Sequence, residues 1–302
     1  MLRHALSRAT EALLPLAAAA AALALVAPST RLSERSDLVL AALVLFTSLG
    51  MQPARLLVVR RRAGVLAVLV VIPYVLLAPV AWLVSLPFSG AVSDGVLALG
   101  VSSTEVAAVG LVAIAGGSTV LALGALTGSL VLAALAGPLL LGALAGAEAD
   151  VASGELVGRF SLVVLVPLAV GLLIRGSSPA LDRAEPELAG SATLAVVVLI
   201  YAAMSGAREG GELLEAAAAS GLFLAATAVV VAGWLVLAPA ELRATGALVI
   251  ELRDFAVAAA LASQAFGPSA ATVSGVYGVL MLLLGAAAAH WLPSRRQPDA
   301  AV

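Results

Sequence analysis

Long apolar stretches separated by short polar breaks cover most of the 302-residue chain. Most of these stretches are apolar on all sides rather than along one helical face, which is typical of helices surrounded by lipid. A bilayer core of about 30 Å needs roughly 20 helical residues to cross it. The pattern predicts ten membrane-spanning helices, at residues 11–28, 37–52, 64–88, 92–114, 118–145, 156–175, 189–206, 214–238, 243–265 and 269–291.

The composition agrees with this pattern. Hydrophobic residues make up 62% of the chain and charged residues only 11%, which is more apolar surface than a soluble domain can hide from water. We therefore expect an all-α integral membrane protein in a lipid bilayer, with no nucleic-acid partner. The absence of cysteine excludes disulfides and thiolate metal sites. No hydrolase, zinc-protease or intramembrane-protease motif is found, so we expect neither an enzyme nor an organic cofactor. The sequence leaves the oligomeric state open.

Arginine placement predicts the orientation, because arginine is enriched in cytoplasmic loops. With ten spans and the N-terminus inside, four arginines lie outside: Arg31, Arg35, Arg159 and Arg208. Many more lie inside: Arg3, Arg8, Arg55, Arg60, Arg61, Arg62, Arg175, Arg183, Arg243, Arg295 and Arg296. Both termini are therefore expected in the cytoplasm, with residues 292–302 as a cytoplasmic tail.

Polar residues interrupt two of the predicted spans. Ser102, Ser103, Thr104 and Glu105 fall near the centre of the fourth span, whereas Glu251, Arg253 and Asp254 fall within the ninth. Glu105 and Asp254 are 149 residues apart, close to half the chain. Five spans per half would place the two halves in opposite orientations, as in secondary transporters built from inverted repeats.

The predicted organisation is thus a single membrane domain, residues 1–302. Its first five-helix repeat covers residues 11–145 and its second, inverted repeat covers residues 156–291. Transporters of this plan place their binding sites at the midplane between the repeats.

The charges in the two interrupted spans favour a functional site. Each charge costs about 2.5–3.5 kcal/mol in the bilayer centre, so four of them are expensive for packing alone. The structural alternative is a buried salt bridge or a water-filled crevice. Glu251 and Asp254 are three residues apart and can share a helix face, whereas the neighbours Arg253 and Asp254 cannot.

Three segments of the chain resemble the bile acid:sodium symporter superfamily. They are "LVLAALVLFTSLGMQPARLLVVRRRAGVLAVLVVIPYVLLAPVAWLV", "AGGSTVLALGALTGSLVLAALAGPLLLGAL" and "LRDFAVAAALASQAFGP". Within them, Leu49–Gly50–Met51, Ala78–Pro79–Val80 and Pro138 occupy places of family motifs. The chain is identified as a divergent bacterial member, so the resemblance implies the bacterial inner membrane as its location.

The resemblance also implies a fold and an activity. The ten helices would form a panel domain and a core domain, with the fourth and ninth helices broken and crossing in the core. Two sodium ions would bind behind the crossing. The solute would be a small organic anion, such as a bile acid, a keto acid or a pantoate-like acid; a distant branch carries arsenite. This sequence has Thr104–Glu105 where the family has a Ser-Asn pair, and Arg253–Asp254 where it has Gln-Asn.

Three mechanisms remain open for these charges. Glu105, Glu251 and Asp254 are candidate sodium ligands that leave a charge of −2 beside Arg253, which two sodium ions or protons would balance. The candidate hydroxyl ligands are Ser102, Ser103, Thr104, Thr127 and Ser129, since oxygen suits a hard cation. Sodium-coupled symport ranks first. In the second mechanism Arg253 pairs with Glu105 or Asp254 and replaces a sodium ion, so that transport is proton-coupled or uncoupled.

In the third mechanism Arg253 binds the carboxylate of an anionic substrate. The N-termini of the helices that follow each break would direct positive dipole ends toward the same anion. Gln264 lies roughly 15 Å along a helix from Asp254, so we expect it to line an access path. A channel and a receptor descended from a transporter are the other function classes compatible with polar breaks in apolar helices.

Overall fold

The computed structural model describes residues 12–54, 62–146, 153–206 and 210–292. This part of the chain contains helices and no β-sheet, which confirms the predicted all-α class. Three of the connections within the described residues include a 3₁₀ turn: η3 (Pro179–Ala184), η4 (Ala240–Leu242) and η5 (Pro268–Ala270). Apart from Leu292, the predicted tail at residues 292–302 lies outside the described residues.

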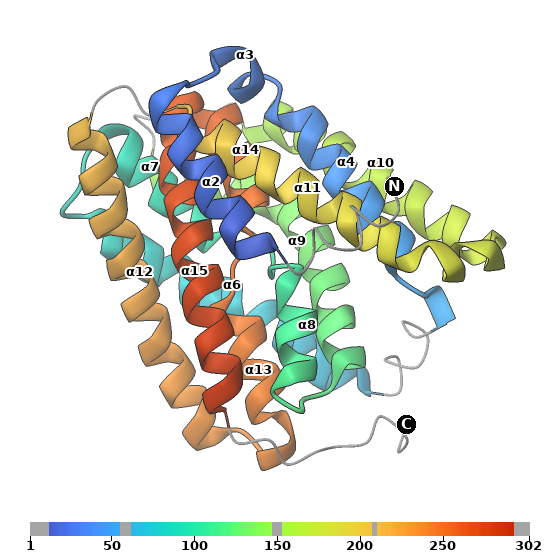
Figure 1. Cartoon of the computed structure of the whole chain (residues 1–302). Helices are drawn as coiled ribbons and strands as arrows, with labels where there is room; N and C mark the ends of the chain where they lie inside the picture. Colours follow the sequence, from blue (N-terminus) through green and yellow to red (C-terminus); the bar gives the residue numbers. More distant parts are fainter. Residues whose placement is uncertain (1–11, 55–61, 147–152, 207–209, 293–302) are drawn as a thin grey trace.

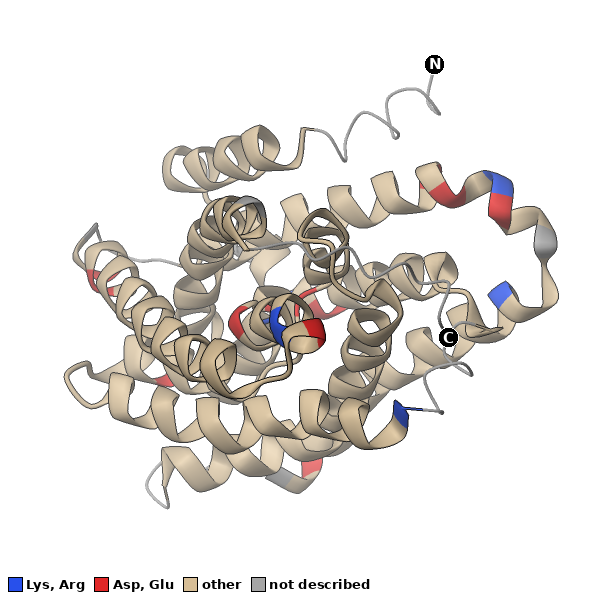
Figure 2. Ribbon diagram, turned by 90° about the horizontal axis from the view of Figure 1, so that it is seen from below, with Lys and Arg blue, Asp and Glu red and all other residues tan. Residues whose placement is uncertain are grey.

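Six helices in the described part are long and apolar enough to cross a membrane, and each coincides with a predicted span. They are α6 (Ala63–Ser85), α9 (Thr119–Ala145), α10 (Ser153–Ser177), α11 (Glu185–Met204), α12 (Gly210–Leu237) and α15 (Ala271–Trp291). Large apolar side chains such as Leu173 and Val229 are more than 70% exposed. Charged residues occupy few positions on the ribbon (Figure 2). Such a surface is stable in contact with lipid rather than water.

The other four predicted spans contain shorter helices. The first two hold one helix each, and the spans at 92–114 and 243–265 hold two helices each, separated by non-helical residues. These helices are α2 (Leu13–Val26), α4 (Ser36–Gly50), α7 (Gly90–Gly100), α8 (Ala107–Ile114), α13 (Arg243–Glu251) and α14 (Phe255–Phe266); α3 (Thr30–Ser33) lies between α2 and α4. The expected interruptions of the fourth and ninth segments are therefore present.

The helices pack in two groups (Figure 1). In the first, which we call the outer layer, α4 packs on α10 and α11, and α11 packs on α2. The second, the central group, comprises α6–α9 and α12–α15; here α6 contacts α7, α9 and α12, while α12 contacts α13 and α15. The outer layer meets the central group mainly where α10 contacts α9 and α11 contacts α15. The two interrupted segments lie inside the central group.

Small residues let the interrupted helices pack closely. Residues 256–262 of α14 are alanine, valine or leucine, and all are buried. A Cβ atom added at Gly278 of α15 would lie 2.7 Å from the Phe255 ring, and one added at Gly100 would overlap the Ala81 methyl group. Membrane helices associate through such close contacts because lipid provides no hydrophobic drive between them.

We predict that Gly100→Ala destabilises the protein, because the new methyl group overlaps Ala81 and lies 3.0 Å from the Leu77 carbonyl oxygen. Overpacking of this kind costs about 1–3 kcal/mol. The matched control is Gly110→Ala in α8, where an added Cβ has nothing within 4 Å. Thermal unfolding in detergent should show a lower midpoint for Gly100→Ala only. Equal midpoints for the two variants would mean that the α6–α7 contact is looser than described.

Candidate functional site

The two interrupted segments cross and pair with each other through one antiparallel β-bridge. The Asp254 amide donates to the Ser103 carbonyl oxygen (2.8 Å), and the Glu105 amide donates to the Leu252 carbonyl oxygen (2.9 Å). Thr104 and Arg253 lie opposite each other at the centre of this pairing. Each segment therefore supplies hydrogen bonds that the other loses by leaving the helix, which matters because a buried unpaired backbone group costs several kcal/mol in lipid.

Side chains from two flanking helices bond to the remaining central amides. The Thr104 amide donates to Ser129 Oγ of α9 (3.0 Å). The Arg253 amide donates to the Tyr277 hydroxyl of α15 (3.1 Å). Helices α9 and α15 coincide with the predicted fifth and tenth spans, and each supplies one hydroxyl group to a central amide.

The predicted hydroxyl ligands around the crossing also bond to the protein. Ser102 Oγ donates to the Leu99 carbonyl oxygen (2.9 Å), Ser103 Oγ to Asp254 Oδ2 (3.3 Å) and Thr104 Oγ1 to the Val249 carbonyl oxygen (3.3 Å). Ser129 Oγ donates to the Leu126 carbonyl oxygen (3.0 Å). These bonds use the hydroxyl protons and hold the backbone in place. Each oxygen keeps at least one lone pair for a ligand, because in the described structure only Ser129 Oγ also accepts a hydrogen bond, from the Thr104 amide.

Thr127 lies on a different face of α9 from Ser129. Its hydroxyl donates to the Leu123 carbonyl oxygen (2.9 Å) and lies 3.6 Å from Met51 Sδ, next to the end of α4. No described hydrogen bond connects it to the crossing. Of the five predicted hydroxyls, the structure thus brings together four.

Asp254 is the N-cap of α14. Its Oδ1 accepts hydrogen bonds from the Ala256 and Val257 amides, both at 2.9 Å, and its Oδ2 accepts one from Ser103. A carboxylate at this position satisfies free helix amides and interacts favourably with the positive end of the helix dipole. The cap explains why α14 begins at Phe255 without a helix-breaking glycine.

Glu105 lies one residue before Val106, the N-cap of α8, and its carboxylate accepts fewer hydrogen bonds than that of Asp254. Its Oε1 accepts a long hydrogen bond from the Ala107 amide (3.5 Å), and its Oε2 is buried without a partner among the described residues. The residue is only 3% exposed. A buried carboxylate with so few donors is costly when ionised, so this group is suited to binding a proton or a metal cation.

Arg253 is fully buried, at 0% exposure. None of its three guanidinium nitrogens has a hydrogen-bond partner in the described part of the chain. The guanidinium carbon lies 5.3 Å from the centre of the Tyr74 ring, a cation–π contact. The ion pair with Glu105 or Asp254 considered from the sequence is thus not formed here, and the guanidinium has hydrogen-bonding capacity left for an anion.

Glu251 belongs to the end of α13, and its bonds are directed away from the crossing. Its Oε1 accepts a hydrogen bond from Thr227 Oγ1 of α12 (3.0 Å), and its Oε2 is buried without a partner among the described residues. Helical spacing does not place it beside Asp254, because α13 ends at Glu251 and the chain then becomes extended. No group of three or more Asp, Glu, His or Cys side chains in the described residues is arranged to hold a metal ion.

Gln264 lies at the other end of α14 and connects the two helix groups. Its Nε2 donates to Asp37 Oδ1 of α4 (2.8 Å), and Asp37 Oδ2 accepts from Arg159 of α10 (2.9 Å). The structure therefore places Gln264 in a polar cluster between the central group and the outer layer. Whether it lines an access path stays a prediction.

Sequence reasoning missed three residues of the site: Tyr74, Tyr277 and Thr227. Tyr74 faces the Arg253 guanidinium and donates to the Ser129 carbonyl oxygen (2.8 Å). Tyr277 accepts from the Arg253 amide and donates to the Glu251 carbonyl oxygen (3.1 Å). The chain has three tyrosines, and all three lie within predicted spans, so their positions alone do not distinguish Tyr74 and Tyr277 from Tyr201.

We predict that substitutions at the two buried acids, Asp254 and Glu105, affect the stability of the protein differently. Asp254→Ala removes two hydrogen bonds to the α14 N-terminus and should lower the free energy of unfolding by about 1–2 kcal/mol. Glu105→Gln removes a poorly partnered charge and should leave the thermal unfolding midpoint unchanged or raised. Thermal unfolding in detergent measures both. A loss for Glu105→Gln as large as that for Asp254→Ala would contradict the assignment of Asp254 as the structural cap.

Comparison with known proteins adds one match. A protein-family model described as the SBF-like CPA transporter family matches residues 11–289, which include the crossing and every α-helix of the described residues except the last residues of α15. No curated protein matches the chain.

Proposed function

Because this chain belongs to the SBF-like CPA transporter family, a family of membrane transporters, we propose that it is a secondary active transporter of a small organic anion. The long apolar helices agree with a multi-pass membrane protein. A transporter family also agrees with the expectation that the chain is not an enzyme. The proposal adds a substrate class, a coupling ion and a mechanism of alternating access to these findings.

Ten spans in two inverted repeats are part of the proposal. An offset of 149 residues relates Ser103 to Leu252, Thr104 to Arg253 and Glu105 to Asp254, and the backbone hydrogen bonds at the crossing are reciprocal under that exchange. Helix packing supports the same relation. The α6–α9 contact corresponds to α12–α15, α6–α7 to α12–α13, and α4–α10 to α11–α2. Transport would proceed by movement of the central group against the outer layer, around the crossing.

The buried guanidinium of Arg253 is the main support for an anionic substrate, because it has no hydrogen-bond partner among the described residues. An arginine binds a carboxylate with two parallel charge-assisted hydrogen bonds. The positive ends of α8 and α14 also lie at the crossing and favour anions, although the Ala256 and Val257 amides of α14 are already bound by Asp254, so Arg253 supplies the free donors. A small carboxylate that enters when the helix groups separate would therefore find donors that the protein leaves unused.

The proposed coupling ion is sodium. Glu105 Oε2 is buried without a partner in the described structure, and the hydroxyl oxygens of Ser103, Thr104 and Ser129 lie around the same crossing. Carboxylate, hydroxyl and carbonyl oxygens are suited to a hard cation. The cation would lower the cost of keeping Glu105 ionised in the membrane, so that its binding and that of the anion favour each other.

Proton coupling is the second candidate, and Arg253 is the observation that favours it. Its fixed positive charge already lies at the crossing, opposite Thr104, where a bound cation would otherwise balance the carboxylates. Glu105 would then need only a proton to become neutral. The two candidates differ in whether sodium or a pH gradient drives uptake.

We predict that an inward sodium gradient accelerates uptake of an organic acid into proteoliposomes. The probe is the acid that most raises the thermal unfolding midpoint in a panel of short keto acids and pantoate-like acids. Glu105→Gln should abolish the stimulation by sodium, because the cation loses its carboxylate ligand. Uptake that is unchanged when choline replaces sodium, but accelerates with an inward proton gradient, would exclude sodium and support the second candidate. Non-saturable flux would indicate a channel.

We predict that Arg253→Gln weakens binding of the same acid by more than about thirtyfold, since a hydrogen bond to a charged group contributes roughly 2 kcal/mol. The thermal unfolding midpoint of the unliganded variant should stay the same or rise, because an unpaired buried charge has been removed. The acid-induced thermal shift measures binding. Retained affinity in Arg253→Gln would show that the anion binds elsewhere, even if transport is intact.

A further inference from the structure

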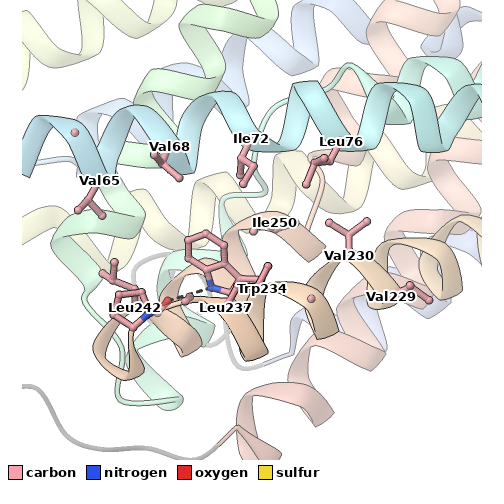
Figure 3. Close-up of a pocket in the computed structure, with 14 residues that line it drawn as sticks. Val65, Val68, Ile72, Leu76, Val229, Val230, Trp234, Leu237, Leu242 and Ile250 are labelled. Atoms are coloured by element: carbon pink, nitrogen blue, oxygen red, sulfur yellow. Dashed lines mark hydrogen bonds between the residues drawn. The ribbon is translucent and has the colours of Figure 1, made fainter.

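An apolar groove opens between α6 and α12, with residues of η4 and α13 completing its lining (Figure 3). Its cavity volume is about 560 Å³. Val65, Val68, Ile72 and Leu76 of α6 point toward Trp234, Leu237 and the valines of α12, and Ile250 of α13 lies between the two helices (Figure 3). The lining contains no charged residue. An apolar cavity of this size at a lipid-facing surface fits a hydrocarbon chain rather than a polar solute.

The length of the groove matches one leaflet of a bilayer. Val65 and Leu76 are eleven positions apart on α6, which corresponds to about 16 Å of helix. The hydrocarbon core of a bilayer is about 30 Å thick, so one leaflet contributes about 15 Å. The groove thus begins near the N-termini of α6 and α13, and its length takes it about as far as the middle of the membrane.

The wall of the groove is held in a fixed shape by Trp234. Its indole packs directly on Gly246 of α13, where an added Cβ would overlap the ring. Its Nε1 donates a hydrogen bond to the Leu242 carbonyl oxygen (3.3 Å). A groove whose shape is fixed beforehand loses little conformational entropy when an occupant binds.

Two arginines lie at the end of the groove that is nearest to water. Arg62 precedes Gly64 by two residues, and Arg243 directly follows Leu242; Gly64 and Leu242 both line the groove. Arg243 Nε donates to the carbonyl oxygen of Ala238 (3.1 Å), another lining residue, so this side chain lies over the groove end. Glu241 is exposed on the same turn and leaves this end with a net positive charge.

We propose that this groove binds one acyl chain of an anionic phospholipid, whose phosphate is held by Arg62 and Arg243. The apolar groove has the length of an acyl chain in one leaflet, and the positive charge at its end matches the phosphate of such a lipid. Basic residues close to a membrane surface attract anionic headgroups in this way. The site is separate from the crossing and does not depend on the proposed transport activity.

Native mass spectrometry of the purified full chain in detergent tests the acyl-chain part with phosphatidylglycerol and phosphatidylcholine of identical chains. Gly233 lines the groove, and an added Cβ there has nothing within 4 Å, so Gly233→Leu introduces a side chain into the groove at a position that is open at Cβ. We expect this variant to bind phosphatidylglycerol more than about tenfold more weakly, because the displaced methylenes lose their burial. The matched control is Gly221→Leu on the same helix, also open at Cβ and outside the groove.

Binding of the headgroup is tested by comparing an anionic with a zwitterionic lipid and by removing the charge of each arginine. The wild-type chain should prefer phosphatidylglycerol over phosphatidylcholine, and Arg62→Gln and Arg243→Gln should each reduce that preference about fivefold. Arg183→Gln, exposed in η3, is the control that should leave it unchanged. Equal retention of both lipids by the wild-type chain, or unchanged retention in Gly233→Leu, would overturn the proposal. Dissociation of a dimer in Gly233→Leu would instead assign the groove to a second copy of this chain.

Discussion

The structure depends on one constraint: inside a bilayer, every backbone group that leaves a helix must find a partner within the protein. Residues 101–106 and 252–254 leave their helices at the same depth, and each segment pairs with the other through Ser103, Glu105, Leu252 and Asp254. Neither interruption is satisfied alone. The two breaks must therefore form together and in register, and this shared requirement brings residues from distant parts of the chain to one place.

The same crossing gives two similar acids different environments. Asp254 has three hydrogen-bond donors and closes the end of a helix, whereas Glu105 has one long hydrogen bond and a free buried oxygen. Local geometry, rather than residue type, separates a structural carboxylate from one suited to bind a cation or proton. Arg253 differs from both, since its main contact is the face of Tyr74 and its hydrogen-bonding groups stay unused among the described residues.

Much of the fold could be predicted because hydropathy reports which segments leave water, and the polar residues at 102–105 and 251–254 mark where helices cannot continue. The details of the site depend on tertiary contacts that spacing does not encode. From sequence, Ser129 is expected only as an ion ligand, and Tyr277 is not singled out. Their bonds to the Thr104 and Arg253 amides follow only from the packing of α9 and α15 on the crossing. Likewise, the helical spacing of Glu251 and Asp254 lost its meaning once α13 ended between them. The contact of Gln264 with Asp37 joins residues 227 positions apart, beyond any local pattern.

In the proposed repeat the two halves are chemically unequal, since Thr104 of one half lies opposite Arg253 of the other. In a carrier of the proposed kind, the two repeats exchange their conformations between the outward-facing and inward-facing forms, so a pseudo-two-fold rotation approximately relates the two forms. The Arg253 guanidinium has no charged counterpart in the other half, so its position within the transmembrane electric field would differ between the two forms. The outward-facing and inward-facing forms would then be unequally populated without substrate, and a membrane voltage would change the ratio of the two populations.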